Sequence, residues 1–229
     1  MSVLATSALA EKYSDRDHLI VQNLVQQPKA LLVLAHGAGA DMNHDFMETI
    51  TSLLNLKQIS VIRFNFPYMV KRAEDGKRRP PDRMPKLIDG FLSLLSSINS
   101  DLPLFIAGKS MGGRVAATLM NESISGDVFS DLKGGICLGY PFHPQKKPEN
   151  LRLEPLQNNQ KKVLIVQGER DALGNKDEIS GYTLSALCQV LFLPDGDHNL
   201  KPRVKSGFTH QQHLETTITA IVRFIDENR

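Results

Sequence analysis

A serine flanked by glycines is the first candidate for chemistry in this chain. The stretch FIAGKSMGG, residues 105–113, contains GKS, the end of a phosphate-binding P-loop, and also GKSMG, the pattern of a nucleophile elbow around Ser110. A P-loop would need a glycine at position 103, but the chain has Pro103 there, followed by four apolar residues without glycine. The spacing therefore excludes a P-loop and favours an elbow that carries a reactive serine.

An elbow requires a strand before the serine and a helix after it. Its tight turn brings the two backbones so close that only small residues fit two positions before and two positions after the nucleophile. Gly108 and Gly112 meet this demand around Ser110. A helix is predicted to follow over MGGRVAATLMNE, residues 111–122, whose apolar side chains fall on one face.

A serine hydroxyl is a poor nucleophile unless a base takes its proton and an acid orients that base. In enzymes with such an elbow, the acid and then the histidine follow the serine along the chain. After the apolar run VLIVQG the chain reads GERDALG, with Glu169 and Asp171, and after VLFLP it reads DGDHNL, with His198. Asp171 lies farther beyond the strand end than Glu169, so we predict a triad of Ser110, Asp171 and His198.

Each of these residues also has an ordinary structural interpretation. His198 alone fits a loop histidine in a turn, and Asp171 alone fits a helix cap or a turn residue. Their joint order and their placement after successive strands favour the catalytic interpretation. Asp195 and Asp197 flank the histidine too closely to be first choices for the acid, but either is a candidate for tuning the orientation of its ring.

Acyl transfer also needs donors for the negative charge that develops on the substrate oxygen, and one lost donor costs about 3 kcal/mol. Met111 N–H is the first candidate, because it directly follows the nucleophile at a helix N-terminus. The second donor is expected in the loop HGAGA, residues 36–40, with Ala38 N–H as first choice and Gly39 N–H as second. Gly37 and Gly39 are expected to border the substrate, whereas a plain strand-to-helix turn is the alternative for this loop.

Short apolar runs alternate along the chain with segments of helical periodicity. The runs are rich in Val, Ile, Leu and Phe. They cover residues 31–35, 60–64, 104–108, 135–139, 163–168 and 190–194. Helical spacing of apolar residues is found over 46–54, 84–98 and 214–225. The alternation predicts one α/β domain over residues 1–229, with a mostly parallel sheet of about six to seven strands flanked by helices. Residues 18–25 are expected to add an antiparallel edge strand.

Composition excludes several classes of protein. Of the 229 residues, 41% are hydrophobic and 23% charged, as in ordinary globular proteins. A mean hydropathy of −0.22 and the lack of a long apolar run argue against a membrane span. The apolar start MSVLATSALA has no basic residue before it and ends at Glu11, so we expect no secretory signal and a cytoplasmic protein. The net charge of +2 is too small for a nucleic-acid-binding surface over the whole chain, and no cysteine or histidine spacing predicts a metal site.

The motifs HGAGA, GKSMGG, GERD and GDHNL, in this order, resemble those of serine hydrolases of the α/β-hydrolase superfamily. More narrowly, RFNFPY followed by RRPPDR, and GYPFHPQKKPENLR, resemble a small lidless group that includes testis-expressed protein 30 and the dienelactone-hydrolase-like bacterial proteins. The resemblance runs from about Leu31 to the C-terminal helix and implies an α/β-hydrolase fold with acyl-hydrolase activity. Dienelactone hydrolases proper use a cysteine where this chain has Ser110, so their lactone chemistry does not carry over. Some eukaryotic members act in chromatin-associated assemblies, which keeps a non-catalytic interaction or scaffold role as the alternative.

Six basic residues crowd the segment between Pro67 and Met84, and these are Lys71, Arg72, Lys77, Arg78, Arg79 and Arg83. We expect a solvated loop here because Glu74, Asp75 and Asp82 dilute its charge, with an anionic substrate or a phosphate-bearing partner as the alternative. Nucleic acid is not expected because no aromatic residue interleaves the cluster.

Three further positions are candidates with simpler alternatives. Lys109, inside the elbow, is a candidate for steering a substrate carboxylate, although solvation or packing is the preferred explanation. His143, in YPFHP, is a candidate residue of the substrate pocket. His210 and His213 stand three apart on the last predicted helix, but they lack a carboxylate-rich context, so we expect surface residues and not a metal pair.

The segment 139–159 is short and contains four prolines, so little or no lid is expected over the serine. An open or shallow site favours small or medium acyl groups. The predicted reaction is hydrolysis of an ester or thioester, in which Ser110 attacks, His198 accepts the proton and Asp171 holds the imidazole. The expected partner is a small-molecule acyl substrate and no cofactor is required, whereas the substrate and the oligomeric state are left open.

Overall fold

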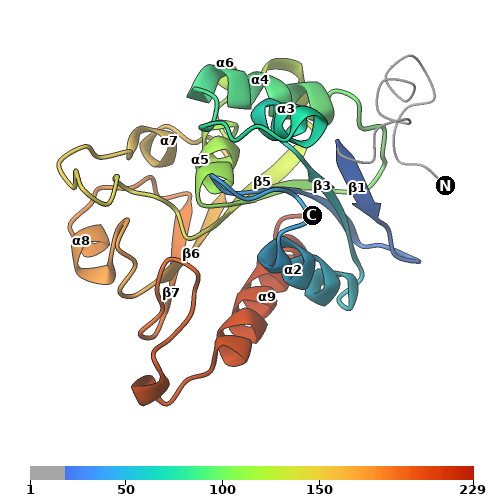
Figure 1. The fold of residues 1–229 in the computed structure, drawn as a ribbon. Helices are drawn as coiled ribbons and strands as arrows, with labels where there is room; N and C mark the ends of the chain where they lie inside the picture. The colour runs from blue at the N-terminus through green and yellow to red at the C-terminus, as the bar shows by residue number, and fades with distance from the viewer. Residues whose placement is uncertain (1–18) are drawn as a thin grey trace.

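The protein contains one seven-stranded sheet, with the order β1-β3-β2-β4-β5-β6-β7 (Figure 1). A computed structural model describes residues 19–229, so the segment MSVLATSALA and His18 lie outside the described residues. The strands are β1 (Ile20–Asn23), β2 (Ala30–Ala35), β3 (Ile59–Phe64), β4 (Leu104–Lys109), β5 (Leu132–Leu138), β6 (Val163–Gly168) and β7 (Cys188–Leu193). Only β1 pairs antiparallel, with β3, and the other neighbours pair in parallel. The predicted sheet is confirmed, including the antiparallel edge strand, which is shorter than expected.

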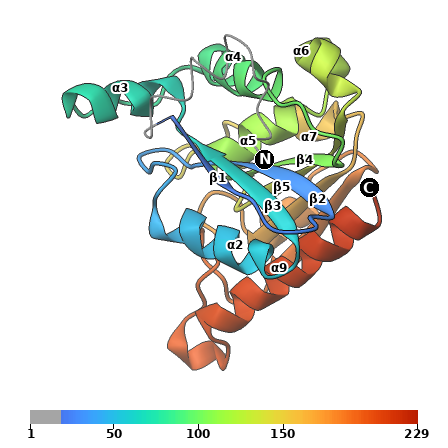
Figure 2. The same cartoon turned by 90° about the vertical axis from the view of Figure 1, so that its right-hand side faces the viewer.

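Helices cover both faces of the sheet (Figure 2). On one face lie α2 (Asp45–Asn55) and α9 (His210–Asp226), and on the other lie α3 (Pro67–Asp75), α4 (Met84–Leu95), α5 (Met111–Thr118) and α6 (Glu122–Ser125). The short helices α7 (Glu154–Gln157) and α8 (Lys176–Ser180) and two 3-10 turns, at Gly126–Phe129 and Val204–Ser206, complete the described elements. Parallel strands need such crossover helices, so both faces are apolar.

Strand β2 shows how the sequence divides the core into two layers. Every residue of this strand is buried. Leu31, Val33 and Ala35 pack into the cluster beneath α4 and α5. The alternate residues Leu32 and Leu34 pack into the cluster beneath α2 and α9. Because side chains alternate between the faces of a strand, a continuous apolar run supplies both layers at once.

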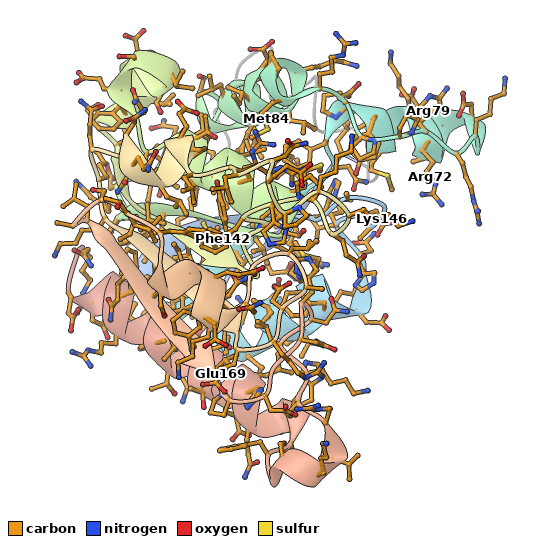
Figure 3. The ribbon with its side chains drawn as sticks, turned by 90° about the vertical axis from the view of Figure 1, so that its left-hand side faces the viewer. Arg72, Arg79, Met84, Phe142, Lys146 and Glu169 are labelled. Carbon is orange, nitrogen blue, oxygen red and sulfur yellow. The ribbon has the colours of Figure 1, made fainter. Side chains whose placement is uncertain are left out.

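The segment predicted as a basic loop begins with a helix, which corrects that expectation. Helix α3 has Pro67 in its first turn and is followed by Gly76, which adopts a left-handed φ of 71°. Proline in the first turn is an ordinary start signal and glycine just after the last turn an ordinary stop signal, and the charge-based prediction overlooked both. Tyr68 and Met69 face the core, and the helix projects from the body of the molecule, where Figure 3 labels Arg72.

Little covers the carboxyl edge of the sheet. Between positions 139 and 159 the chain forms only the four-residue helix α7, so residues 19–229 contain no helical cap domain. The buried side chains of Pro155 and Leu156 tie α7 to the core. No helix within residues 19–229 combines the length and the apolar character needed to cross a membrane. The lidless fold predicted from the sequence is confirmed.

Candidate active site

Ser110 occupies a strained turn between β4 and α5. Its backbone has φ 51° and ψ −113°, a conformation that residues with a side chain rarely adopt. A Cβ added at Gly108 would lie 2.1 Å from the carbonyl carbon of Gly112, and one added at Gly112 would lie 2.6 Å from Ala35 O. The backbones of strand and helix are therefore in direct contact, so the two glycines are required for this turn.

Ser110, His198 and Asp171 form one continuous chain of hydrogen bonds. His198 Nε2 lies 2.9 Å from Ser110 Oγ, and His198 Nδ1 lies 2.8 Å from Asp171 Oδ2. A carboxylate can only accept, so Nδ1 carries the proton toward Asp171 and Nε2 is free to accept from the hydroxyl. The three residues follow β4, β7 and β6, whose carboxyl ends meet at one edge of the parallel sheet. The structure thus brings together the three side chains that the sequence placed in the triad.

Glu169, the other acid after β6, is turned away from the histidine. Its Oε1 lies 2.8 Å from Lys176 Nζ, and its Oε2 accepts the N–H of Asp195 at 3.0 Å. The hydrogen bond from Lys176 is the main cause that lowers the pKa of Glu169. Figure 3 labels Glu169, which is partly exposed, whereas Asp171 is fully buried. The two carboxylates are only two residues apart, yet only Asp171 reaches His198.

The aspartates beside His198 shape its loop and do not bond its ring. Asp195 pairs with the Arg203 guanidinium and accepts the Arg203 N–H at 2.9 Å. Asp197 Oδ1 accepts the backbone N–H groups of Asn199 and Lys201, at 2.8 and 3.0 Å. Neither aspartate hydrogen-bonds the ring, so the tuning role suggested by the sequence has no direct contact behind it.

A cavity of about 170 Å³ opens beside Ser110. Gly37, Ala38 and Lys109 line it together with Ser110 and His198. Phe46 and Met47 of α2 contribute its apolar wall. Its remaining lining residues are Ala40, His44 and Asn199.

Of the two expected oxyanion donors, Met111 follows the serine along the chain, and Ala38 lines the same cavity as the serine. Met111 is the first residue of α5, so its amide lies at the helix N-terminus, although its side chain does not line the cavity. Ala38 belongs to a loop that packs on the elbow, since a Cβ added at Gly37 would lie 3.6 Å from Ser110 Cβ. Gly39 lines the adjoining depression and not the cavity itself.

His36 fixes the loop that carries Ala38, a role the sequence did not predict. Its Nδ1 lies 2.8 Å from Gly37 O, and its Nε2 accepts the Phe66 N–H at 3.1 Å. Burial lowers the pKa of His36 to about 4, so the ring is neutral at pH 7 and donates only from Nδ1. A histidine directly after a fully apolar strand was the signal for such a structural role.

Lys109 lines the cavity but is held by the histidine loop. Its side chain is 8% exposed, and Nζ donates a hydrogen bond of 2.7 Å to His198 O. Burial lowers the pKa of Lys109 to about 8. The expectation that it steers a substrate therefore competes with a visible contact to the backbone of His198.

His143 does not line the cavity, contrary to its place among the candidate pocket residues. It is 3% exposed, with Nε2 at 3.4 Å from Glu178 Oε2 and Nδ1 at 3.1 Å from Pro144 O. Its backbone N–H donates to Leu173 O at 3.2 Å, so it joins the segment after β5 to the loop that holds Asp171.

The histidines of α9 approach two different backbone carbonyls. His210 Nε2 lies 3.2 Å from Asn199 O, and His213 Nδ1 lies 2.9 Å from Leu200 O. His213 is buried, which corrects the expectation that both are surface residues. Within residues 19–229, no three His, Cys, Asp or Glu side chains are grouped so that they could hold a metal ion.

The sequence patterns also missed Gln167, which is fully buried near the end of β6 and donates to Asp171 Oδ2 at 3.0 Å. An amide inside the otherwise apolar run VLIVQG was the signal that could have identified it. Buried polar side chains are rare in such strands unless they have specific partners.

Comparison with known proteins assigns the family. The model of the alpha/beta hydrolase domain matches residues 28–226. The chain belongs to the alpha/beta hydrolase domain family. This membership confirms the superfamily that the motifs suggested.

Solved structures of the same fold cover almost the whole chain at low sequence identity. Est1E from Butyrivibrio proteoclasticus is 14% identical, with a TM-score of 0.65 over 93% of this chain and 96% of that chain. A dienelactone hydrolase from Anabaena variabilis is 14% identical, with a TM-score of 0.66 over 91% of each chain. A serine hydrolase without a lid from Xanthomonas campestris is 15% identical, with a TM-score of 0.61 over 91% of this chain and 88% of that chain. At these identities the likeness establishes the fold alone.

Proposed function

We propose that this protein is a serine hydrolase that cleaves an ester or thioester of a small or medium acyl group through an acyl-enzyme. The observation that carries the proposal is the unbroken hydrogen-bond chain from Ser110 Oγ through His198 to Asp171. Membership of the alpha/beta hydrolase domain family supports it. The strained serine turn supports it too, because such strain is commonly found at functional sites.

The first half of the reaction forms the acyl-enzyme. Ser110 Oγ forms a bond to the substrate carbonyl carbon while its proton passes to His198 Nε2. The carbonyl oxygen becomes an oxyanion, which the N–H groups of Met111 and Ala38 would stabilise. Asp171 keeps the imidazolium in place through Nδ1. Collapse of the intermediate breaks the bond to the alcohol or thiol, which leaves with the proton from Nε2.

The second half of the reaction releases the acid. Water gives a proton to His198 Nε2 and attacks the acyl carbon, and the second intermediate expels Ser110 Oγ, which recovers the proton from the histidine. The net change is the addition of one water across the acyl bond. These steps draw only on side chains and amides of this chain, so we propose that no cofactor takes part.

The size and lining of the cavity support a small or medium acyl group. Its volume of about 170 Å³ is below the several hundred cubic ångströms of typical sites for drug-sized ligands. Phe46 and Met47 supply an apolar wall, and the chain lacks a cap domain over residues 19–229 that would enclose a long acyl chain. Closeness to the testis-expressed protein 30 and dienelactone-hydrolase-like group, a cytoplasmic location and a single domain complete this proposal.

A fluorophosphonate probe tests the nucleophile. We expect intact-protein and peptide mass spectra to show the covalent adduct on Ser110, no adduct in Ser110→Ala, and strongly slowed labelling in His198→Ala. Glu169→Gln should label like the wild type, because that carboxylate is bonded elsewhere. A folded wild-type protein that does not react would contradict the enzyme and favour a non-catalytic interaction role.

A series of p-nitrophenyl esters and acyl thioesters of graded chain length tests the substrate class. We expect kcat/KM to be highest for acetyl to butyryl groups and to decline once the chain exceeds the cavity beside Ser110. Ala38→Leu, which adds bulk to the lining of the cavity, should lower activity most for the longest chains. Equal rates for short and long chains would contradict the proposed size limit.

A further inference from the structure

Gln167 is an amide buried in a strand that otherwise contains apolar residues and a glycine. It is fully buried one position before the end of β6, whose sequence is VLIVQG. An apolar side chain would satisfy the packing of a parallel strand covered on both faces. Burying an amide instead costs free energy unless its hydrogen bonds are made, so its partners should explain why it is there.

The amide contacts two separate segments at the carboxyl edge of the sheet, the one after β5 and the loop after β6. Its Oε1 accepts the Tyr140 N–H at 2.8 Å. Its Nε2 lies 2.9 Å from Gly174 O, 3.0 Å from Asp171 Oδ2 and 3.2 Å from Tyr140 O. The opposite orientation of the amide would place its oxygen against three acceptors, so the network fixes the N–H groups on the side of Asp171.

The contact with Asp171 is made at the atom that serves the histidine. Asp171 Oδ2 accepts both Gln167 Nε2 and His198 Nδ1, while Oδ1 accepts the Leu173 N–H at 2.8 Å. The carboxylate has no exposed surface, so these donors replace the water that would otherwise stabilise its charge. Gln167 Nε2 bonds one carboxylate oxygen and the Leu173 N–H bonds the other. Together these two donors restrict rotation of the carboxylate and so fix how it meets the imidazole.

We propose that Gln167 is a positioning residue that holds the Asp171 carboxylate in the orientation that meets His198 Nδ1. This inference rests on the proposed function, because the orientation matters for catalysis only if the triad is active. Gln167 touches no lining residue of the cavity through these bonds, so its effect should be on the chemical step and its pH dependence, and not on substrate binding.

Two variants separate the donor from the shape of the side chain. Gln167→Met keeps a similar volume but removes the N–H, so the buried anion loses one donor and proton binding to the Asp171–His198 pair becomes easier. Gln167→Glu keeps the shape but sets an oxygen against Asp171 Oδ2, which should have the larger effect. Thr217→Val is the matched control, because this fully buried hydroxyl donates to His213 O and not to the Asp171 carboxylate.

The measurement is the second-order rate of fluorophosphonate labelling of Ser110 as a function of pH. We expect the midpoint of the acidic limb to move upward by about one pH unit in Gln167→Met, the size expected for one lost hydrogen bond to a charged group, and farther in Gln167→Glu. The labelling rate at pH 7 should fall by about ten-fold, with the half-saturating probe concentration unchanged. Thr217→Val should lower the melting temperature without moving the limb.

A second readout needs no turnover and keeps the two proposals distinguishable. Protein labelled with 15N-histidine should show a downfield Nδ1–H signal for His198 that shifts or disappears in Gln167→Met and stays in Thr217→Val. If wild-type Ser110 labels but both Gln167 variants keep the wild-type limb and signal, Gln167 is only structural and the hydrolase proposal stands. If wild-type Ser110 does not label, the hydrolase proposal fails, and an unchanged signal in the variants would overturn the positioning role as well.

Discussion

The acid end and the histidine end of the proposed triad are held in different ways. Asp171 is fully buried and receives hydrogen bonds from two side chains and one amide. The His198 side chain is 27% exposed, and within residues 19–229 its ring forms hydrogen bonds with Ser110 and Asp171 alone. The backbone of His198 is instead held by Lys109 Nζ, which donates a hydrogen bond to His198 O.

This difference shows that the two charged partners of the proposed reaction are supported in different ways. The carboxylate is enclosed by donors, whereas the imidazole is left partly exposed. A carboxylate that stays ionised throughout can be enclosed by permanent donors. A histidine that gains and loses a proton at each step needs a ring that remains reachable, so its support comes through the backbone. The comparison predicts that a substitution of Asp171 lowers the rate of the chemical step directly. A substitution that disturbs the support of His198 should lower the rate by displacing its ring.

The largest effect is expected from neutralising the acid. Asp171→Asn can no longer hold the Nδ1-protonated tautomer, and the corresponding change in a serine protease lowers kcat roughly 10,000-fold. We expect a loss of similar order in ester hydrolysis. Glu169→Gln, two residues away, is the matched control and should stay within about two-fold of the wild type because its contacts face Lys176 and Asp195. Equal losses in the two variants would show that the acid has been misassigned.

A smaller loss should follow from displacing the histidine backbone. Gly139 has φ 65°, and a Cβ there would lie 2.8 Å from His198 O and 3.0 Å from Lys109 Nζ. Gly139→Ala should lower kcat about 100-fold through a shift of the ring, with the protein still folded. Gly207→Ala carries a similar backbone strain at φ 80° with no neighbour within 4 Å, so it should cost about 1 kcal/mol of stability and leave kcat unchanged. Full activity in Gly139→Ala would mean that the loop adapts.

Removing the lysine contact should cost about ten-fold in kcat/KM and change the pH dependence of stability. Burial lowers the pKa of Lys109 from 10.5 to about 8, although the carboxylates of Asp171 and Asp197 act the other way. The unfolded chain therefore binds this proton more tightly, so the charged lysine destabilises the fold below about pH 8, and that cost disappears as the pH rises toward 10.5. Relative to Lys109→Met, the wild type should gain up to about 3 kcal/mol over this window. Urea unfolding of both proteins at several pH values measures the difference, and a constant offset would contradict it.

The smallest effect is expected at the outer side of the histidine loop. Arg203 lowers the pKa of Asp195 to about 2 through its hydrogen bonds, so this exposed pair stays ionised until the pH falls well below the range of any activity assay. Asp195→Asn also tolerates the left-handed backbone at this position, where φ is 53°. We expect kcat/KM to change by less than about two-fold, with the acidic limb unmoved. A shifted limb would place Asp195 among the groups that control the ring.

The sequence was sufficient where a local pattern carries the constraint. The elbow needs Gly108 and Gly112 because two backbones touch there. Both glycines lie within five consecutive residues, so the requirement is visible in a short sequence pattern. The strands were found because burial on both faces leaves continuous apolar runs. The order of Ser110, Asp171 and His198 was read from loops that follow successive strands.

The sequence was insufficient where function depends on contacts between distant segments. Lys109 and His198 are 89 residues apart, and nothing in either motif shows that the lysine reaches that carbonyl. Gln167 was counted simply as part of an apolar strand, because an assignment based on the mean character of a run overlooks a single polar residue. Helix α3 was missed since its charges outweighed the capping signals of Pro67 and Gly76.

The direct contact between Gly108 and Gly112 also determines how the serine turn can open. Strand β4 is buried along its whole length and pairs with a strand on each side. The turn that follows it therefore should not open through local unfolding of this strand. Amide protons around Ser110 should exchange with solvent only when the whole molecule unfolds, whereas those of the peripheral α3 should exchange through small local openings. The proposed nucleophile would then be among the last parts of the described protein to unfold.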